Sequence, residues 1–114
     1  LVREGKGGFI DTGCRNDLRT FFSLLNLCDL LVTSDTLALH AAVGLKKRVV
    51  ALFGPTSAAE IDLYGRGEKV VAPVPCQCCY RTDCDVSPNC METIEPETVL
   101  TAIRQLLAPP APER

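Results

Sequence analysis

Polar residues able to bind a ligand are concentrated in two short turns of this chain, each directly after an apolar run. The turns are Ser34-Asp35-Thr36 and Gly54-Pro55-Thr56. The runs before them, 29–33 and 48–53, have the composition of strands buried on both faces of a sheet. Open parallel α/β sheets bind ligands at the carboxyl ends of their strands. The sequence therefore predicts one ligand site formed by the two turns.

The first turn has the residue types that bind a phosphorylated sugar. A short helix is predicted to begin at Thr36, and its first backbone N–H groups favour an anion such as a diphosphate. His40 follows Thr36 by four residues and shares its helix face, where an imidazole can donate to a phosphate oxygen. Asp35 suits the hydroxyl groups of a sugar or ribose, because a carboxylate accepts hydrogen bonds and repels phosphate.

Each of these residues also has a purely structural interpretation. Ser34 or Asp35 fits a helix N-cap that stabilises the chain by about 1 kcal/mol and binds nothing. His40 is the single histidine, on an otherwise apolar segment, and fits a hydrogen-bonded core residue. Gly54-Pro55 makes a turn without any ligand. The pairing of the Asp35 turn with His40 favours a ligand, because both would face one pocket.

The elements before these turns are predicted from apolar periodicity. Residues 1–7 have loop composition, and a short strand is expected at 9–11. A helix follows over 18–27, where the apolar residues form one broad face, and Asn16 or Asp17 is its expected N-cap. Cys14 and Cys28, near the ends of these elements, are expected to be ordinary core residues.

The elements after the first turn follow from caps and breakers. The helix that begins at Thr36 ends at Gly44, a residue that suits a left-handed cap. Ser57 and Glu60 have the spacing of a capping box before one or two helical turns. A fourth strand is expected at 69–72, and Pro96 favours the start of a closing helix.

This alternation of strands and helices predicts an α/β fold with a mostly parallel sheet and right-handed crossovers. Four strands are few for such a sheet, so we expect a partial doubly wound, Rossmann-like domain over residues 1–108, with earlier strands upstream of Leu1. Residues 109–114 are expected to be a disordered tail. Neither GxGxxG nor GxxxxGK[ST] occurs, which excludes both glycine-rich phosphate motifs.

Composition excludes several function classes. The net charge of −2 argues against a nucleic-acid partner, and the one basic run, Lys46-Lys47-Arg48, fits a solvated turn between a helix and a strand. The apolar runs are far shorter than the roughly 20 residues of a membrane helix, so no transmembrane segment is expected.

A cysteine-rich loop over 75–91 has chemistry of its own. Cys76 and Cys79 have C-x2-C spacing, and Cys84 and Cys90 are candidates for the third and fourth ligands of a structural zinc ion. Disulfide or redox pairing is the second interpretation, and unligated packing cysteines are the third.

The two turns and the cysteine loop together resemble glycosyltransferase family 9, the ADP-heptose:lipopolysaccharide heptosyltransferases. The resemblance rests on D-T-x-x-x-H at Asp35, Thr36 and His40, on F-G-P-T at 53–56, and on Tyr64-Gly65. It implies a two-domain GT-B enzyme whose carboxy-terminal domain binds the donor. This chain would be the second half of that carboxy-terminal domain. Such a chain would bind the donor without catalysing transfer, since the general base lies in the amino-terminal domain.

By this resemblance, donor contacts fall on Ser34, Asp35, Thr36, Leu37, His40, Gly54, Pro55 and Thr56. Many members carry glycine after Asp-Thr, so Leu37 is a departure that narrows the pocket. The resemblance further implies an ADP-heptose donor, inversion at the anomeric centre, no required metal, and a lipid-linked saccharide acceptor. It places a bacterial enzyme in the cytoplasm, with peripheral contact to the inner membrane face.

Two other functions fit the same residues. A zinc-stabilised α/β interaction module would use the cysteine loop as its partner surface. A sugar-nucleotide-binding relative without transferase chemistry would retain the pocket alone. Loss of partner binding on chelation would indicate the former, and upstream sequence without a suitable carboxylate would indicate the latter.

Overall fold

The computed structural model describes residues 3–4, 8–74, 79–80 and 89–108. Its strands are β1 (Arg3–Glu4), β2 (Ile10–Asp11), β3 (Leu30–Ser34), β4 (Arg48–Phe53) and β5 (Gly67–Val71). Its helices are α1 (Leu18–Leu27), α2 (Leu37–Gly44) and α3 (Pro96–Leu107), with short 3-10 helices η1 (Ala58–Glu60) and η2 (Met91–Thr93). The predicted helix at Pro96 is confirmed, and the last predicted strand begins two residues earlier than expected.

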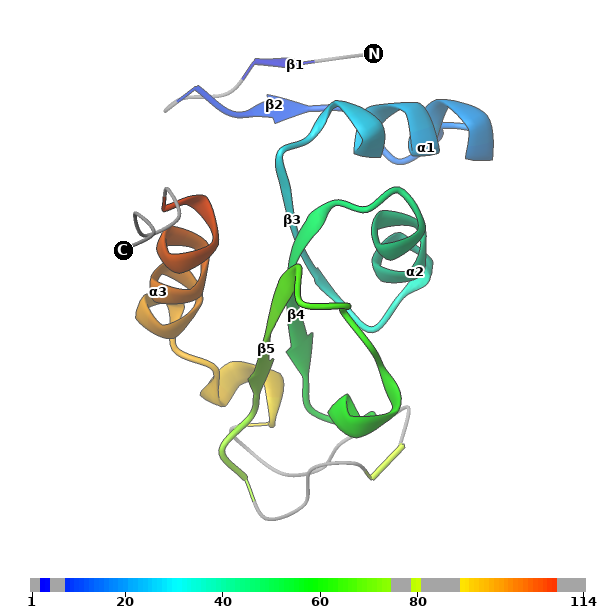
Figure 1. Cartoon of the computed structure of the whole chain (residues 1–114). Coiled ribbons are helices and arrows are strands. Elements are labelled where there is room, and N and C mark those ends of the chain that lie inside the picture. Colours follow the sequence, from blue (N-terminus) through cyan, green and yellow to red (C-terminus); the bar gives the residue numbers. More distant parts are fainter. Residues whose placement is uncertain (1–2, 5–7, 75–78, 81–88, 109–114) are drawn as a thin grey trace, which may run out of the picture.

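Strands β3, β4 and β5 form a three-stranded parallel sheet within the described residues, with β4 at its centre. Val32 of β3 lies opposite Val50 of β4, and Val50 lies opposite Glu68 of β5. Helix α2 packs on β3 and β4, whereas α3 packs on β4 and β5 from the other face (Figure 1). This arrangement confirms the predicted α/β, Rossmann-like fold class.

The central strand is apolar throughout because both of its faces are covered. Val49, Ala51 and Phe53 pack in one core cluster with residues of α2. Val50 points to the opposite face and packs with Val70 of β5 and Ala102 of α3. Successive residues of a strand face opposite sides, so two helices on a parallel sheet require a continuous apolar run in its middle strand.

The first predicted strand does not join the parallel sheet, and this expectation was wrong. Strand β2 pairs antiparallel with β1, whose residues the sequence assigns to a loop. The two strands lie beside α1 at the top of the view, away from β5 (Figure 1). Local composition predicts an extended segment at Ile10, but it does not specify that this segment pairs with residues only six to eight positions upstream.

The N-cap of α1 is Asp17 rather than Asn16. Its carboxylate accepts a hydrogen bond of 2.8 Å from the backbone N–H of Thr20. The hydrogen bonds from Thr20 favour the charged form, so they lower the pKa of Asp17 below its ordinary value. The sequence therefore predicted the cap type, and the structure chose between adjacent residues.

The left-handed cap of α2 is Lys46, not the predicted Gly44. Lys46 has φ 59°, and its N–H donates to the carbonyl of Val43 at 3.0 Å. The N–H of Lys47 donates to the carbonyl of Ala42 at 2.9 Å, which completes a Schellman motif. Gly44 stays inside the helix because the chain turns toward β4 only two residues later.

The basic run is not a wholly solvated turn. Lys46 is exposed, but the Arg48 guanidinium donates to the carbonyl of Leu106 at 2.9 Å and to that of Asp29 at 3.3 Å. Arg48 therefore joins the start of β4 to the carboxyl end of α3, whose last carbonyls lack partners within the helix. Among the described residues, no helix is both long enough and apolar enough to cross a bilayer.

Candidate functional site

The ends of β3 and β4 meet at a pocket of about 220 Å³. Its walls come from both predicted turns, from the end of β4 and from η2: Ser34, Asp35, Leu52, Pro55, Thr56 and Met91. Parallel register explains this convergence, since Ser34 lies opposite Leu52 and both strands end at the same edge. The pocket contains four of the eight predicted donor contacts.

The amino terminus of α2 lies beside this pocket and has no side-chain cap. Thr36 is the N-cap, but its side chain makes no capping hydrogen bond. Its hydroxyl lies instead 3.1 Å from the hydroxyl of Thr33 and 3.4 Å from the carbonyl of Ser34. The capping role considered for Ser34 or Asp35 is therefore wrong. The first N–H groups of α2 are left for a ligand or water.

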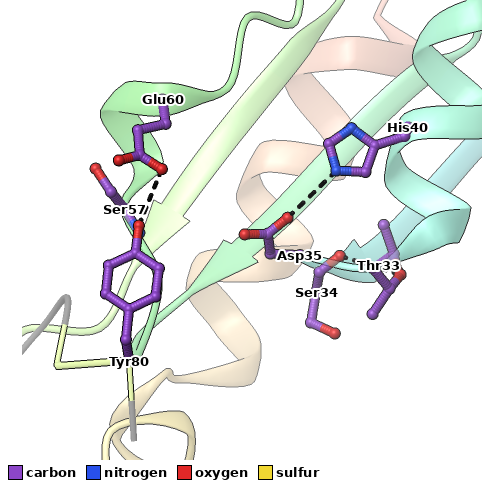
Figure 2. Close-up of polar contacts among 8 residues, drawn as sticks. Thr33, Ser34, Asp35, His40, Ser57, Glu60 and Tyr80 are labelled. Carbon is purple, nitrogen blue, oxygen red and sulfur yellow. Dashed lines mark hydrogen bonds and ion pairs between the residues drawn. The ribbon is translucent and has the colours of Figure 1, made fainter.

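Asp35 and His40 form a pair across the first turn of α2. The Asp35 carboxylate lies 3.7 Å from Nε2 of His40, and the two side chains point toward one another (Figure 2). The His40 side chain is 61% exposed, so it is not the buried core histidine that its apolar segment permitted. The Asp35 side chain is 23% exposed and lines the pocket. The two side chains present a carboxylate and an imidazole side by side.

The remaining predicted contacts have other surroundings. Leu37 is the first residue of α2, is 55% exposed, and does not line the pocket. Gly54 is buried, and a Cβ built on it would lie 2.5 Å from Cys90 Sγ and 3.2 Å from Met91 Sδ. Because Gly54 has no side chain, residues 90–91 can pack directly against this turn.

Tyr80 is a residue that the sequence interpretation missed. Its hydroxyl accepts from the Ser57 N–H at 3.0 Å and lies 3.0 Å from Glu60 Oε2, to which it donates (Figure 2). The predicted capping box is not formed directly, because the Tyr80 hydroxyl stands between its two members. The spacing of Ser57 and Glu60 contained the signal, but its third participant is distant in sequence.

The cysteine cluster is only partly described. Cys76 and Cys84 lie outside the described residues, and Cys79 and Cys90 are free cysteines. Within the ranges that the structure describes, no group of three metal-ligating side chains could hold an ion. The zinc site thus stays a prediction. Cys14 and Cys28 are exposed, so the expectation that they are core residues was wrong.

Comparison with known proteins identifies the family of this chain. The model of glycosyltransferase family 9 (heptosyltransferase) matches residues 11–89, which is most of the chain and includes both turns. The chain belongs to glycosyltransferase family 9. Similar curated members are two proteins named lipooligosaccharide heptosyltransferase 2, from Campylobacter jejuni subsp. jejuni serotypes O:6 and O:2.

The family 9 chain is 28% identical to the first of these over 98 residues, and 27% identical to the second over 96. The alignments cover 83% and 82% of this chain but only 31% and 30% of the relatives. The chain therefore spans about a third of the length of the curated relatives it matches. No solved structure matches it.

Proposed function

We propose that this family 9 chain is the donor-binding part of a GT-B glycosyltransferase that moves heptose from ADP-heptose to a lipopolysaccharide-type acceptor, with inversion. One observation supports this most directly. Asp35 and the second turn line one pocket at the carboxyl edge of a parallel sheet, with the uncapped amino terminus of α2 directly after Asp35 and His40, which does not itself line the pocket, 3.7 Å from the Asp35 carboxylate. A nucleoside diphosphate sugar needs this combination of an anion site and hydroxyl acceptors.

The chemistry follows from the groups present. The first N–H groups of α2 and the exposed His40 imidazole would stabilise charge on the departing diphosphate. Such fixed donors can perform the role of a divalent metal, so none is required. Asp35 would accept hydrogen bonds from ribose or sugar hydroxyl groups, since a carboxylate is a hydrogen-bond acceptor. It would not contact the phosphates, because its negative charge repels them.

Transfer itself requires groups that we assign to a separate amino-terminal domain. There a carboxylate would act as general base on the acceptor hydroxyl, which attacks the anomeric carbon from the face opposite the diphosphate. The acceptor would be a lipid-linked saccharide. The complete enzyme would work in the cytoplasm and reach that acceptor at the membrane surface.

Nucleotide titration tests the proposal. The chain should bind ADP with chemical-shift changes confined to the pocket and the adjoining start of α2, at Ser34, Asp35, Thr36 and Thr56. Inorganic pyrophosphate should compete, because the α2 terminus recognises the diphosphate. Shift changes elsewhere, or no saturation by ADP, would overturn the assignment.

A further inference from the structure

We infer that Tyr80 is a positioning residue for the donor pocket, acting through the turn that forms one pocket wall. The inference rests on the proposed function, since it concerns the same site. Tyr80 does not line the pocket itself. It contacts the segment directly after Pro55 and Thr56, which do.

The Tyr80 hydroxyl joins the two ends of the η1 segment. It accepts from the N–H of Ser57, the residue before η1, and donates to the carboxylate of Glu60, the last residue of η1. In a capping box the Glu60 carboxylate would accept from the Ser57 N–H, and here the tyrosine hydroxyl accepts that hydrogen bond in its place. Because the hydroxyl donates to a charged carboxylate, its oxygen is polarised. It therefore accepts the hydrogen bond from the Ser57 N–H more strongly.

The backbone of Tyr80 makes a second contact with the same wall. Its N–H donates to the carbonyl of Pro55 at 2.6 Å. Tyr80 has φ 55°, in the left-handed region that non-glycine residues seldom occupy. The backbone N–H and the side-chain hydroxyl of Tyr80 are therefore both hydrogen-bonded. Such contacts stabilise a backbone conformation that is otherwise unfavourable.

Lys69 contacts both ends of η1 independently of Tyr80. The Lys69 ammonium donates to the carbonyl of Ala58 at 2.6 Å and also to that of Ile61. Cys90 and Met91 pack against Gly54 from the other side of the turn. Among the described residues, Tyr80 thus adds two hydrogen bonds that help to fix where Pro55 and Ser57 lie relative to Asp35.

Substitution of the hydroxyl alone tests this inference. Tyr80→Phe should weaken ADP binding by the chain roughly threefold to tenfold, the equivalent of one hydrogen bond. It should also accelerate hydrogen exchange of the Ser57 amide, which loses its acceptor. Tyr64→Phe is the matched control, because Tyr64 is exposed and lies outside the pocket. It should change neither quantity.

A second pair of variants guards against misfolding of Tyr80→Phe. Glu60→Ala should weaken ADP binding, and Glu60→Gln, which retains an acceptor, should restore most of the affinity. If Tyr80→Phe binds ADP within about twofold of the parent chain, the positioning role is wrong. If the parent chain itself does not bind ADP, the proposed function fails. In that case the hydrogen bond between the Ser57 N–H and the Tyr80 hydroxyl is still tested, because Tyr80→Phe must accelerate hydrogen exchange of the Ser57 amide.

Discussion

The Asp35 carboxylate lies 3.7 Å from Nε2 of His40, so the D-T-x-x-x-H motif places its acidic and basic ends side by side. The two positions are five apart along the chain, with four residues between them. Asp35 lies just before the N-cap Thr36, and His40 lies one turn into α2. Under the proposed function, Asp35 would accept hydrogen bonds from hydroxyl groups and His40 would donate to phosphate.

The two members of this pair should have separable roles. His40→Ala should weaken binding of both ADP and pyrophosphate by about tenfold, because it removes a donor to a phosphate oxygen. Asp35→Ala should weaken ADP-heptose binding but leave pyrophosphate binding unchanged or stronger, since it removes a negative charge. Titration calorimetry with the three ligands measures both effects.

The exposure of the pair limits its contribution to stability. An exposed ion pair contributes about 0.2–1 kcal/mol, so both variants should unfold close to the parent midpoint. Asp29→Ala, at the opposite end of β3, is the control and should bind all three ligands normally. Equal losses for both variants on pyrophosphate would contradict the division of roles.

Gly54 should not tolerate even a methyl group. The Cβ of Gly54→Ala would lie 2.5 Å from Cys90 Sγ in a buried turn, so we expect a loss of about 1–3 kcal/mol in the free energy of unfolding. Gly44→Ala is the matched control, because nothing lies within 4 Å of its Cβ. It should be neutral or more stable by about 0.4–1 kcal/mol. Urea denaturation of both variants measures the difference, and equal midpoints would refute the packing role of Gly54.

Stability should depend on pH through Asp17. Its pKa is lowered in the folded chain, so its contribution is present above the ordinary carboxyl pKa and is lost as pH falls through the lowered value. Asp17→Ala should therefore be less stable than the parent near neutrality, and the difference should vanish in strong acid. Asp17→Asn keeps the capping acceptor without a titrating charge, and its stability relative to Asp17→Ala should not change with pH. Unfolding midpoints across the acid range decide this.

The zinc hypothesis for Cys76, Cys79, Cys84 and Cys90 makes a quantitative prediction. The purified, reduced chain should contain about one equivalent of zinc, as a tetrahedral thiolate site requires. Cys79→Ser should lose the metal, whereas Cys14→Ser, which changes an exposed cysteine outside the cluster, should retain it. Metal analysis showing less than about half an equivalent in the parent chain would contradict a zinc site.

The sequence by itself determined the elements whose signals are local. The continuous apolar run of β4 indicated coverage on both faces, and Pro96 marked the start of α3. The polar turns marked the ends of β3 and β4, and register then brought Asp35 and Thr56 to one pocket. These features follow from periodicity and turn chemistry, which act over a few residues.

Only the tertiary structure decided which partner each strand edge and backbone group takes, both among near neighbours in the sequence and among distant segments. It showed that β2 pairs with β1 rather than with the parallel sheet, and that Lys46 instead of Gly44 has the left-handed conformation. It also showed that Tyr80 completes the Ser57–Glu60 box. Each of these contacts depends on the partner that the folded chain brings near. A backbone N–H group or a strand edge can pair with many different partners equally well. Local sequence therefore specified which groups need a partner, and the fold selected it.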